Sequence, residues 1–331
     1  MASGQERKLR RRIRSVQSTK KITRAMELIA ASRIVKAQQR VAAARPYSEQ
    51  VTAVMQTLAG SGAAGLQHPL LQERESVRAV GFVVVAADRG LAGAYNSSVL
   101  RHAERSMKAA QGEGKDLAVV TSGRKAEGYF RYRGYDLSAA YSGYAEVPSY
   151  EDARRLAAPM VEAYQEGGVD QVQLVYTRFL SMGTQRVVET QLLPLEKGAF
   201  EEGAAKAAGA GGVQALYEME PDAETILEEL LPRYVEARVF AALLDAAASE
   251  QAARQRAMKA ATDNAEEMIG KLSVIANKLR QAAITTEIME IVGGAEALRQ
   301  AGRPSTDLLP DQLGIRDLLP DRLDRTGAFR R

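Results

Sequence analysis

The two ends of the chain show the most regular pattern, because small and apolar residues recur there every three or four positions. From residue 5 to residue 58 there is no glycine, and Pro46 is the only proline. The small or apolar positions are Leu9, Ile13, Val16, Met26, Ile29, Ala30, Ala37, Val41 and Ala44, with a polar interruption over 19–23. The spacing predicts one long helix, bent or loosened near Pro46.

The carboxyl-terminal pattern is longer. Residues 221–232 predict a short helix, and from Arg233 to Leu298 no further proline occurs. The later part alternates spacings of four and three at Ala261, Ala265, Met268, Leu272, Ile275, Leu279, Ala282, Thr286, Met289 and Gly293. This is the a/d pattern of a coiled coil, so we expect the two terminal helices to pair antiparallel.

Between these helices the pattern becomes that of strands. Apolar runs predict strands over 78–87, 116–121, 135–141, 169–180 and 186–195, the last of them antiparallel. Helices are expected over 97–110, 124–133 and 149–167, with Asn96 or Ser97 and then Ser149 as N-caps. The alternation predicts an inserted α/β domain with a mostly parallel sheet.

The chain therefore divides into five parts. They are an N-terminal shaft helix (1–60), a globular domain (76–197), a Gly/Ala-rich connector (198–220), a C-terminal shaft helix (221–300) and a Pro/Leu/Asp/Arg tail (301–331), which we expect to be flexible.

The amino-acid composition excludes several kinds of bond and binding site. There is no cysteine, which excludes disulfides and thiolate metal sites, and the two histidines, His68 and His102, are isolated in the sequence. We expect no metal and no cofactor on this chain. No apolar run is long enough to span a bilayer, and the first residues lack the apolar core of a signal peptide. We therefore expect an intracellular protein that meets a membrane only through a partner.

Charge is concentrated at the amino terminus. Residues 1–40 hold twelve Lys and Arg but only two acids, Glu6 and Glu27. Such a block favours an anionic partner, which could be nucleic acid, lipid or an acidic protein. No aromatic residue that could stack on bases occurs before Tyr47, so an acidic protein is favoured and a basic coiled-coil nucleic-acid binder is the alternative.

A glycine-containing turn, "DRGLAGAYN" at 88–96, lies between the first strand and the first helix of the domain. Phosphate-binding loops occupy such positions, so a nucleotide-binding α/β enzyme stays open as an alternative. The simpler interpretation is that Gly90 and Gly93 permit a tight turn and close helix–sheet packing. Asp88 and Arg89 then form a conformational or partner-contact pair.

Four stretches together resemble the gamma subunit of F-type rotary ATP synthases. They are "RRIRSVQSTKKITRAMELIAASRIVKAQQRV" (11–41), "DRGLAGAYN" (88–96), "EELLPRYVEARVFAALLDAAASEQAARQRAMKAATDNAEEMI" (228–269) and "LRQAAITTEIMEIVGGAEAL" (279–298). The resemblance runs from about residue 5 to residue 298. It implies paired terminal helices forming an antiparallel coiled coil, with an inserted Rossmann-like α/β domain.

The resemblance also implies a function. The gamma subunit is the central rotor, standing inside a hexamer of three alpha and three beta subunits, with its foot and the epsilon subunit attached to the membrane ring of c subunits. It carries no catalytic residue, and ATP, ADP and Mg lie on the alpha and beta subunits. We expect no nucleic-acid partner, membrane contact through the c-ring alone, and a place at the cytoplasmic face of a bacterial cell membrane.

Individual residues match the family's contact regions. Lys20, Lys21, Arg24, Met26 and Arg33 match the region that meets the beta subunits, and Asp88, Arg89, Gly90 and Gly93 match the foot loop. The tip that turns in an apolar collar corresponds to Ile284, Ile288, Met289, Ile291, Val292, Gly293 and Gly294. Each glycine inside a helix costs about 1 kcal/mol relative to alanine. We interpret this pair as thinning the tip, with Gly293 continuing the seam so that a neighbour can approach closely.

Two segments depart from the family pattern: the Gly/Ala-rich stretch 198–214 and the tail after residue 300. The tail contains a near-repeat, "DLLPDQLGI" then "DLLPDRLDR". It is either a disordered tail or a brake whose leucine pairs, 308/309 and 318/319, dock on the stator and oppose ATP hydrolysis.

Overall fold

The computed structural model describes residues 2–60, 68–195 and 223–300. The connector 198–220 and the tail 301–331 lie outside the described residues. The described residues form two compact units, one of residues 2–18 with 265–300 and one within residues 19–264.

The described part of the chain begins with one long helix, α1 (Ala2–Gly60), and ends with another, α6 (Ala223–Gln300). Pro46 lies inside α1, as expected for one long helix. The prediction of a separate short helix over 221–232 is wrong, because α6 continues through Pro232. Proline removes one backbone hydrogen bond, but Leu231 and Val235 on either side of it are fully buried. Tertiary packing therefore holds the helix across the break.

Within the larger unit, α1 and α6 pack antiparallel. Thr23 of α1 shares a hydrogen bond of 2.8 Å with Thr262 of α6. Met55, much later in α1, belongs to the same core cluster as Leu231, much earlier in α6. The order of contacts along one helix is thus the reverse of that along the other.

The buried stripe of α1 in this unit is a strict heptad pattern rather than an interrupted one. Its buried or half-buried members are Lys20, Thr23, Glu27, Ala30, Ile34, Ala37, Val41, Ala44, Ser48, Val51 and Met55. Polar residues do occur at 19–23, but they do not break the stripe as predicted, because Lys20 and Thr23 themselves occupy seam positions. Ile29, predicted on the stripe, is 53% exposed.

The smaller unit shows a shifted heptad on α6. Ala265, Leu272 and Leu279 are buried or half-buried as predicted, but the alternate positions are Ile269, Ala276 and Ala283. The predicted alternates Met268, Ile275 and Ala282 are exposed, as are Thr286, Met289 and Gly293. Adjacent small or apolar residues, such as 275 and 276, let the sequence support either stripe.

The globular domain is an α/β fold with a five-stranded sheet of order β3-β2-β1-β4-β5. The strands are β1 (Ala79–Val85), β2 (Asp116–Ser122), β3 (Ala139–Tyr141), β4 (Gln171–Phe179) and β5 (Gln185–Leu193). The first four in the sheet are parallel, and β5 pairs antiparallel with β4, as predicted.

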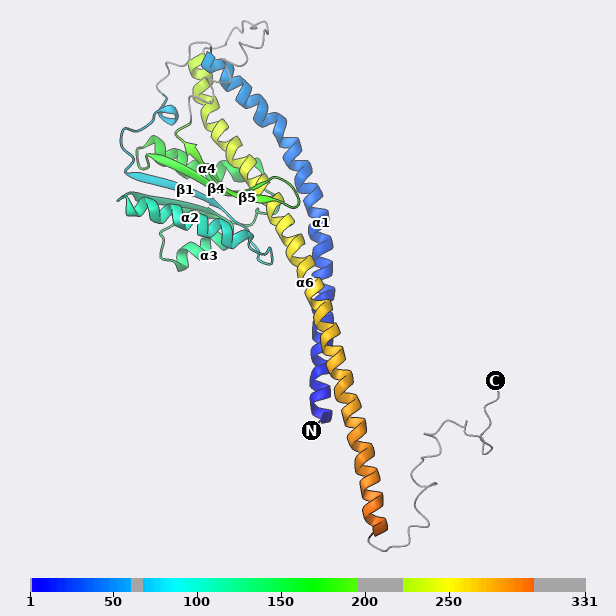
Figure 1. Ribbon diagram of the computed structural model, residues 1–331. Coiled ribbons are helices and arrows are strands. Elements are labelled where there is room, and N and C mark those ends of the chain that lie inside the picture. The colour runs from blue at the N-terminus through cyan, green and yellow to red at the C-terminus, as the bar shows by residue number, and fades with distance from the viewer. Residues whose placement is uncertain (1, 61–67, 196–222, 301–331) are drawn as a thin grey trace. The chain divides into compact units, whose positions relative to one another are not determined.

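Helices cover both faces of this sheet (Figure 1). They are α2 (Tyr95–Gly112), α3 (Arg124–Tyr132) and α4 (Tyr150–Gln165). One core joins α2 and α3 to the sheet around Phe82 and Phe130. The other joins α4 to the opposite face and also contains Met55 of α1 and Leu231 of α6. The terminal helices are therefore built into the core of the α/β domain.

Candidate functional site

The loop 88–96 lies at the carboxyl end of β1, where open α/β sheets bind ligands. Its Asp88 carboxylate accepts backbone hydrogen bonds from Arg124 at the start of α3 (3.1 Å), from Gly143 (2.9 Å) and from Ala145 (3.3 Å). The Arg124 amide lies at the N-terminus of α3, where helix N–H groups can bind an anion. The chain therefore fills this anion position with its own carboxylate.

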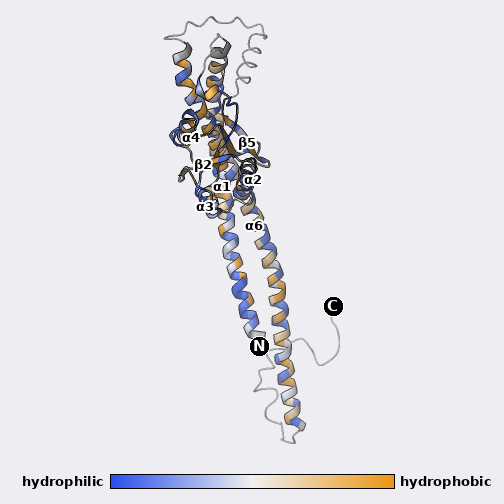
Figure 2. Ribbon diagram, turned by 90° about the vertical axis from the view of Figure 1, so that its left-hand side faces the viewer, coloured by the Kyte–Doolittle hydropathy of each residue, from blue (hydrophilic) through white to orange (hydrophobic). Residues whose placement is uncertain are grey.

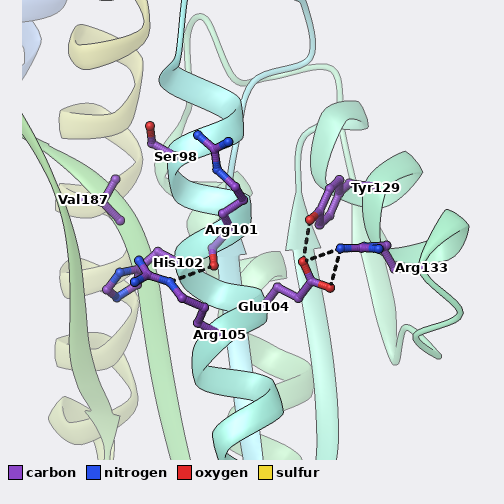
Figure 3. Close-up of a pocket in the computed structure, with 8 residues that line it drawn as sticks. All are labelled: Ser98, Arg101, His102, Glu104, Arg105, Tyr129, Arg133 and Val187. Carbon is purple, nitrogen blue, oxygen red and sulfur yellow. Dashed lines mark hydrogen bonds and ion pairs between the residues drawn. The ribbon is translucent and has the colours of Figure 1, made fainter.

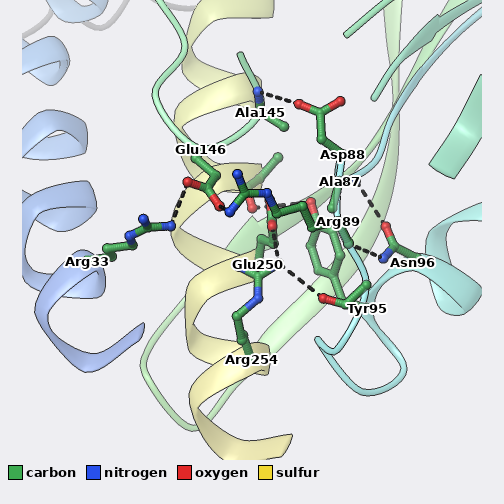
Figure 4. Close-up of polar contacts among 12 residues, drawn as sticks. Arg33, Ala87, Asp88, Arg89, Tyr95, Asn96, Ala145, Glu146, Glu250 and Arg254 are labelled. Carbon is green, nitrogen blue, oxygen red and sulfur yellow. Dashed lines mark hydrogen bonds and ion pairs between the residues drawn. The ribbon is translucent and has the colours of Figure 1, made fainter. Parts of the chain in front are cut away.

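Asn96 fixes the same loop rather than capping a helix. Its Oδ1 accepts from the Ala87 amide at 3.0 Å, and its Nδ2 donates to the Arg89 carbonyl at 3.3 Å (Figure 4). Helix α2 begins at Tyr95 after Ala94, without a side-chain cap. The predicted capping role of Asn96 or Ser97 is wrong, whereas Ser149 does cap α4 in a capping box with Asp152.

The two loop glycines are not equivalent. Gly93 has a positive φ of 57°, and an added Cβ would meet Ala257 at 3.6 Å. Gly90 has no positive φ and only Lys125 near its Cβ direction, at 3.9 Å, so the predicted structural need for glycine there is wrong. Leu91 instead adopts a positive φ of 62°, which is unusual for a side chain of this size.

A buried ion pair on α6 contacts the loop 88–96. Arg254 binds Glu250, and both side chains are less than a tenth exposed. Arg254 also donates to the Gly90 carbonyl at 3.3 Å. Burial raises the pKa of Glu250, and the neighbouring Arg254 acts in the opposite direction. The sequence shows both residues but not that helix packing would enclose them.

The predicted beta-contact residues have different environments. Lys21 is exposed, Met26 is half-buried, and Lys20 lies half-buried on the seam. Arg24 pairs with Glu27 at 2.9 Å, and Arg33 pairs with Glu146 at 2.6 Å. Arg24 and Arg33 are therefore engaged inside the chain. Sequence reasoning missed Glu146 because it lies 113 positions from its partner.

The predicted tip residues are exposed. Exposed fractions are 49% for Ile284, 55% for Ile288, 69% for Met289, 49% for Ile291 and 59% for Val292. An added Cβ at Gly293 or Gly294 would meet nothing within 4 Å. Figure 2 shows many hydrophobic residues along this end of α6, whereas the start of α1 is strongly hydrophilic. Exposed apolar residues in such number indicate a partner surface.

A groove of about 530 Å³ between α2, α3 and β5 holds a second polar cluster (Figure 3). Its Glu104 accepts from the Tyr129 hydroxyl at 2.6 Å and from Arg133 at 3.2 Å. The Tyr129 hydrogen bond is the main cause that lowers the pKa of Glu104 to about 2. Glu104 lies on α2, whereas Tyr129 lies on α3 and Arg133 at the C-cap of α3, so this cluster connects the two helices.

Within residues 2–60, 68–195 and 223–300, no group of three or more His, Cys, Asp or Glu side chains could hold a metal ion. Over the same ranges no helix carries an apolar stretch long enough to cross a bilayer.

The fold and these surfaces define a coiled-coil protein with an inserted α/β domain, whose most distinctive exposed residues lie on its terminal helices. The ATP synthase family model matches residues 5–298. An ATP synthase gamma chain from Frankia casuarinae is 51% identical over 300 residues, which cover 89% of this chain and 98% of the relative.

Two solved structures have the same fold. A chain of the central stalk and c-ring of the Tetrahymena thermophila mitochondrial ATP synthase aligns with a TM-score of 0.54 and 25% identity, covering 72% of this chain and 99% of that one. A chain of the Euglena gracilis mitochondrial ATP synthase aligns with a TM-score of 0.62 and 18% identity, covering 92% and 99%. The chain belongs to the family of ATP synthase gamma chains, the central-stalk or rotor subunits of F-type ATP synthases.

Proposed function

We propose that this chain is the rotor shaft that couples proton-driven rotation of a c-ring to the conformational cycle of three catalytic beta subunits. The coupling is reversible, so that ATP hydrolysis can drive proton pumping. Family membership over residues 5–298 supports this function. The single structural observation that carries it is the exposed apolar end of α6.

A shaft acts by changing affinity rather than by chemistry. Moving a beta subunit from about 1:99 to about 99:1 between two conformations requires a difference of about 5.5 kcal/mol in the free energy of its contacts. An asymmetric shaft supplies that difference if each beta subunit meets another side of it at each angle. ATP, ADP and Mg are then bound by the alpha and beta subunits, and catalysis belongs to the complex.

The basic side of α1 is the proposed contact for acidic surfaces of the beta subunits. Lys20, Lys21, Arg24 and Arg33 supply the charge, and Met26 supplies an apolar contact beside them. Electrostatic attraction is long-ranged and tolerates changing geometry, which suits a surface that must release and rebind.

The carboxyl-terminal end of α6 is the proposed bearing. Its exposed Ile284, Ile288 and Met289 offer apolar contact without directional hydrogen bonds, so the helix can turn in an apolar collar. Gly293 does not continue the intrachain seam, because that seam ends at Ala283. Gly293 and Gly294, which have no side chains, keep the end of α6 narrow inside the proposed apolar collar.

The proposed assembly contains three alpha and three beta subunits, one epsilon subunit and the c-ring. Epsilon and the c-ring bind the globular end of this chain, to which the foot loop 88–96 belongs. The chain then lies at the cytoplasmic face of a bacterial cell membrane and meets that membrane through the c-ring alone.

Co-expression with alpha, beta and epsilon subunits tests this function. We expect a stable complex in which ATP drives rotation of a probe attached to this chain while the hexamer is held on a surface. A chain that ends after residue 283 should still assemble through its remaining helix but should lose torque. ATP hydrolysis without rotation of the full-length chain would contradict the proposal.

The two alternatives have separate tests. A nucleotide-binding enzyme predicts tight binding of ATP, ADP or NAD to the isolated chain in calorimetry, but Asp88 already takes the backbone amide at the N-terminus of α3. A nucleic-acid binder predicts a strong, salt-dependent shift of duplex DNA. We expect neither.

A further inference from the structure

Glu146 connects two arginines that lie far apart in sequence (Figure 4). One carboxylate oxygen lies 2.6 Å from Nη1 of Arg33 on α1, and the other lies 3.5 Å from Nη1 of Arg89 in the loop after β1. Glu146 itself lies in the segment between β3 and α4. Three separate parts of the larger unit therefore meet at one carboxylate.

The neighbouring carboxylates cannot replace Glu146. Asp88 is occupied by three backbone amides, and Glu250 is buried with Arg254. Within the described part of the chain, Glu146 is the ion partner of both Arg33 and Arg89. Two guanidinium groups thus share one carboxylate, which leaves one positive charge in excess at this site.

That excess makes Arg33 exchangeable. Its side chain is 43% exposed and that of Glu146 is 25% exposed, and exposed ion pairs contribute little net stability. If Arg33 turns to another carboxylate, Glu146 keeps Arg89 as its counter-ion. One turn further along α1, Lys36 is exposed and has no ion-pair partner in the described chain. An acidic segment with two carboxylates could therefore bind Arg33 and Lys36 together.

We propose that Glu146 is a positioning residue that holds Arg33 in the free chain and exchanges it with an acidic segment of a surrounding subunit as the shaft turns. This inference rests on the proposed rotor function and adds an internal competitor to its basic contact surface. Because the exchange replaces one ion pair with another, the contact forms and breaks with little change in free energy.

Single variants test the competition. In the full-length chain with epsilon, Glu146→Gln should raise affinity for the alpha–beta hexamer by about two- to fivefold at low ionic strength, with no difference at high ionic strength. Arg33→Gln should lower that affinity, and adding Glu146→Gln to it should have no further effect. Glu151→Gln is the matched control, because that exposed carboxylate pairs only within α4, with Arg154 at 3.7 Å.

A charge swap separates exchange from a static brace. The double variant Arg33→Glu with Glu146→Arg, made on an Arg89→Gln background so that no second arginine faces position 146, restores the intrachain pair but presents a carboxylate to the partner. We expect its thermal stability to match that of Arg89→Gln alone while its affinity for the hexamer stays about two- to fivefold below that of Arg89→Gln alone. Recovery of both properties would overturn the exchange and leave Glu146 as a brace. Failure of the wild-type chain to assemble would instead overturn the rotor function itself.

Discussion

At the scale of single residues, Asp245 on α6 shows how burial and charge compete. Burial raises its pKa from 3.8 to about 6, although Arg178 and Arg45 act to lower it. The folded chain therefore binds a proton between these two values that the unfolded chain has already released. This contribution to the free energy of unfolding is fully present below pH 3.8 and is lost as the pH rises through 6.

Asp245→Asn should consequently stabilise the chain above pH 7, by about 1–2 kcal/mol, and the gain should vanish below pH 4. Unfolding midpoints of variant and wild type across this pH range provide the measurement. Asp263→Asn, an exposed position on the same helix, is the control. A less stable variant at pH 8 would show that the two arginines outweigh burial.

Gly123, between β2 and α3, tests backbone strain. It has a positive φ of 97°, and a Cβ there would lie 2.2 Å from the Ala86 carbonyl oxygen. Gly123→Ala should lower the free energy of unfolding by more than about 2 kcal/mol. Gly114→Ala, with a positive φ of 78° but open space, should cost about 1 kcal/mol in denaturant unfolding. Equal costs would mean that the backbone moves to relieve the contact.

At the scale of elements, the seam between α1 and α6 combines small, apolar and polar residues. The Thr23 and Thr262 hydroxyls share a buried hydrogen bond of 2.8 Å; because each has one proton, one donates across the seam while the other donates to a carbonyl of its own helix. The sequence predicted that polar residues interrupt the stripe, since it could not show that a second threonine lies opposite. A polar residue is tolerated at this seam position because its hydrogen-bond partner, 239 positions away in the sequence, lies opposite it in the fold.

A double-mutant cycle measures this pair. Thr23→Val and Thr262→Val should each cost about 1 kcal/mol, and the double variant should cost less than their sum by about 0.5–1 kcal/mol. Thr285→Val is the control, because its hydroxyl bonds to the Gln281 carbonyl in the same way but without a cross-helix partner. Additive costs would exclude a cooperative bond.

At the scale of the whole molecule, variants at Gly293 and Gly294 test whether the helix can become more stable while rotation of the complex becomes slower. The Cβ of a leucine at either position would meet no described atom within 4 Å, so the replacement should raise helix stability, by about 0.5–1 kcal/mol. The same variants should slow ATP-driven rotation of the assembled complex. Gly270→Leu, which also has open space on α6, should leave rotation unchanged. Unchanged rotation at 293 and 294 would contradict the narrow-tip interpretation.

The tail stays a prediction from sequence, because residues 301–331 lie outside the described chain. Deleting 303–331 should raise the rate of ATP hydrolysis in the isolated hexamer complex if its leucine pairs act as a brake. Replacing Leu308, Leu309, Leu318 and Leu319 by serine in the full-length chain should have the same effect. An unchanged rate after deletion would exclude the brake.

The sequence by itself determined the two long helices, the parallel sheet with its antiparallel edge and the capping box at Ser149, because each depends on local periodicity or spacing. It also carried the family resemblance, through long motifs near both ends. Only the tertiary structure decided which of two neighbouring stripes forms the seam, such as Ala276 rather than Ile275. It also decided that Asp88 fills the anion position and that Glu146 meets Arg33. Those outcomes depend on contacts between distant segments, and no local pattern in the chain records them.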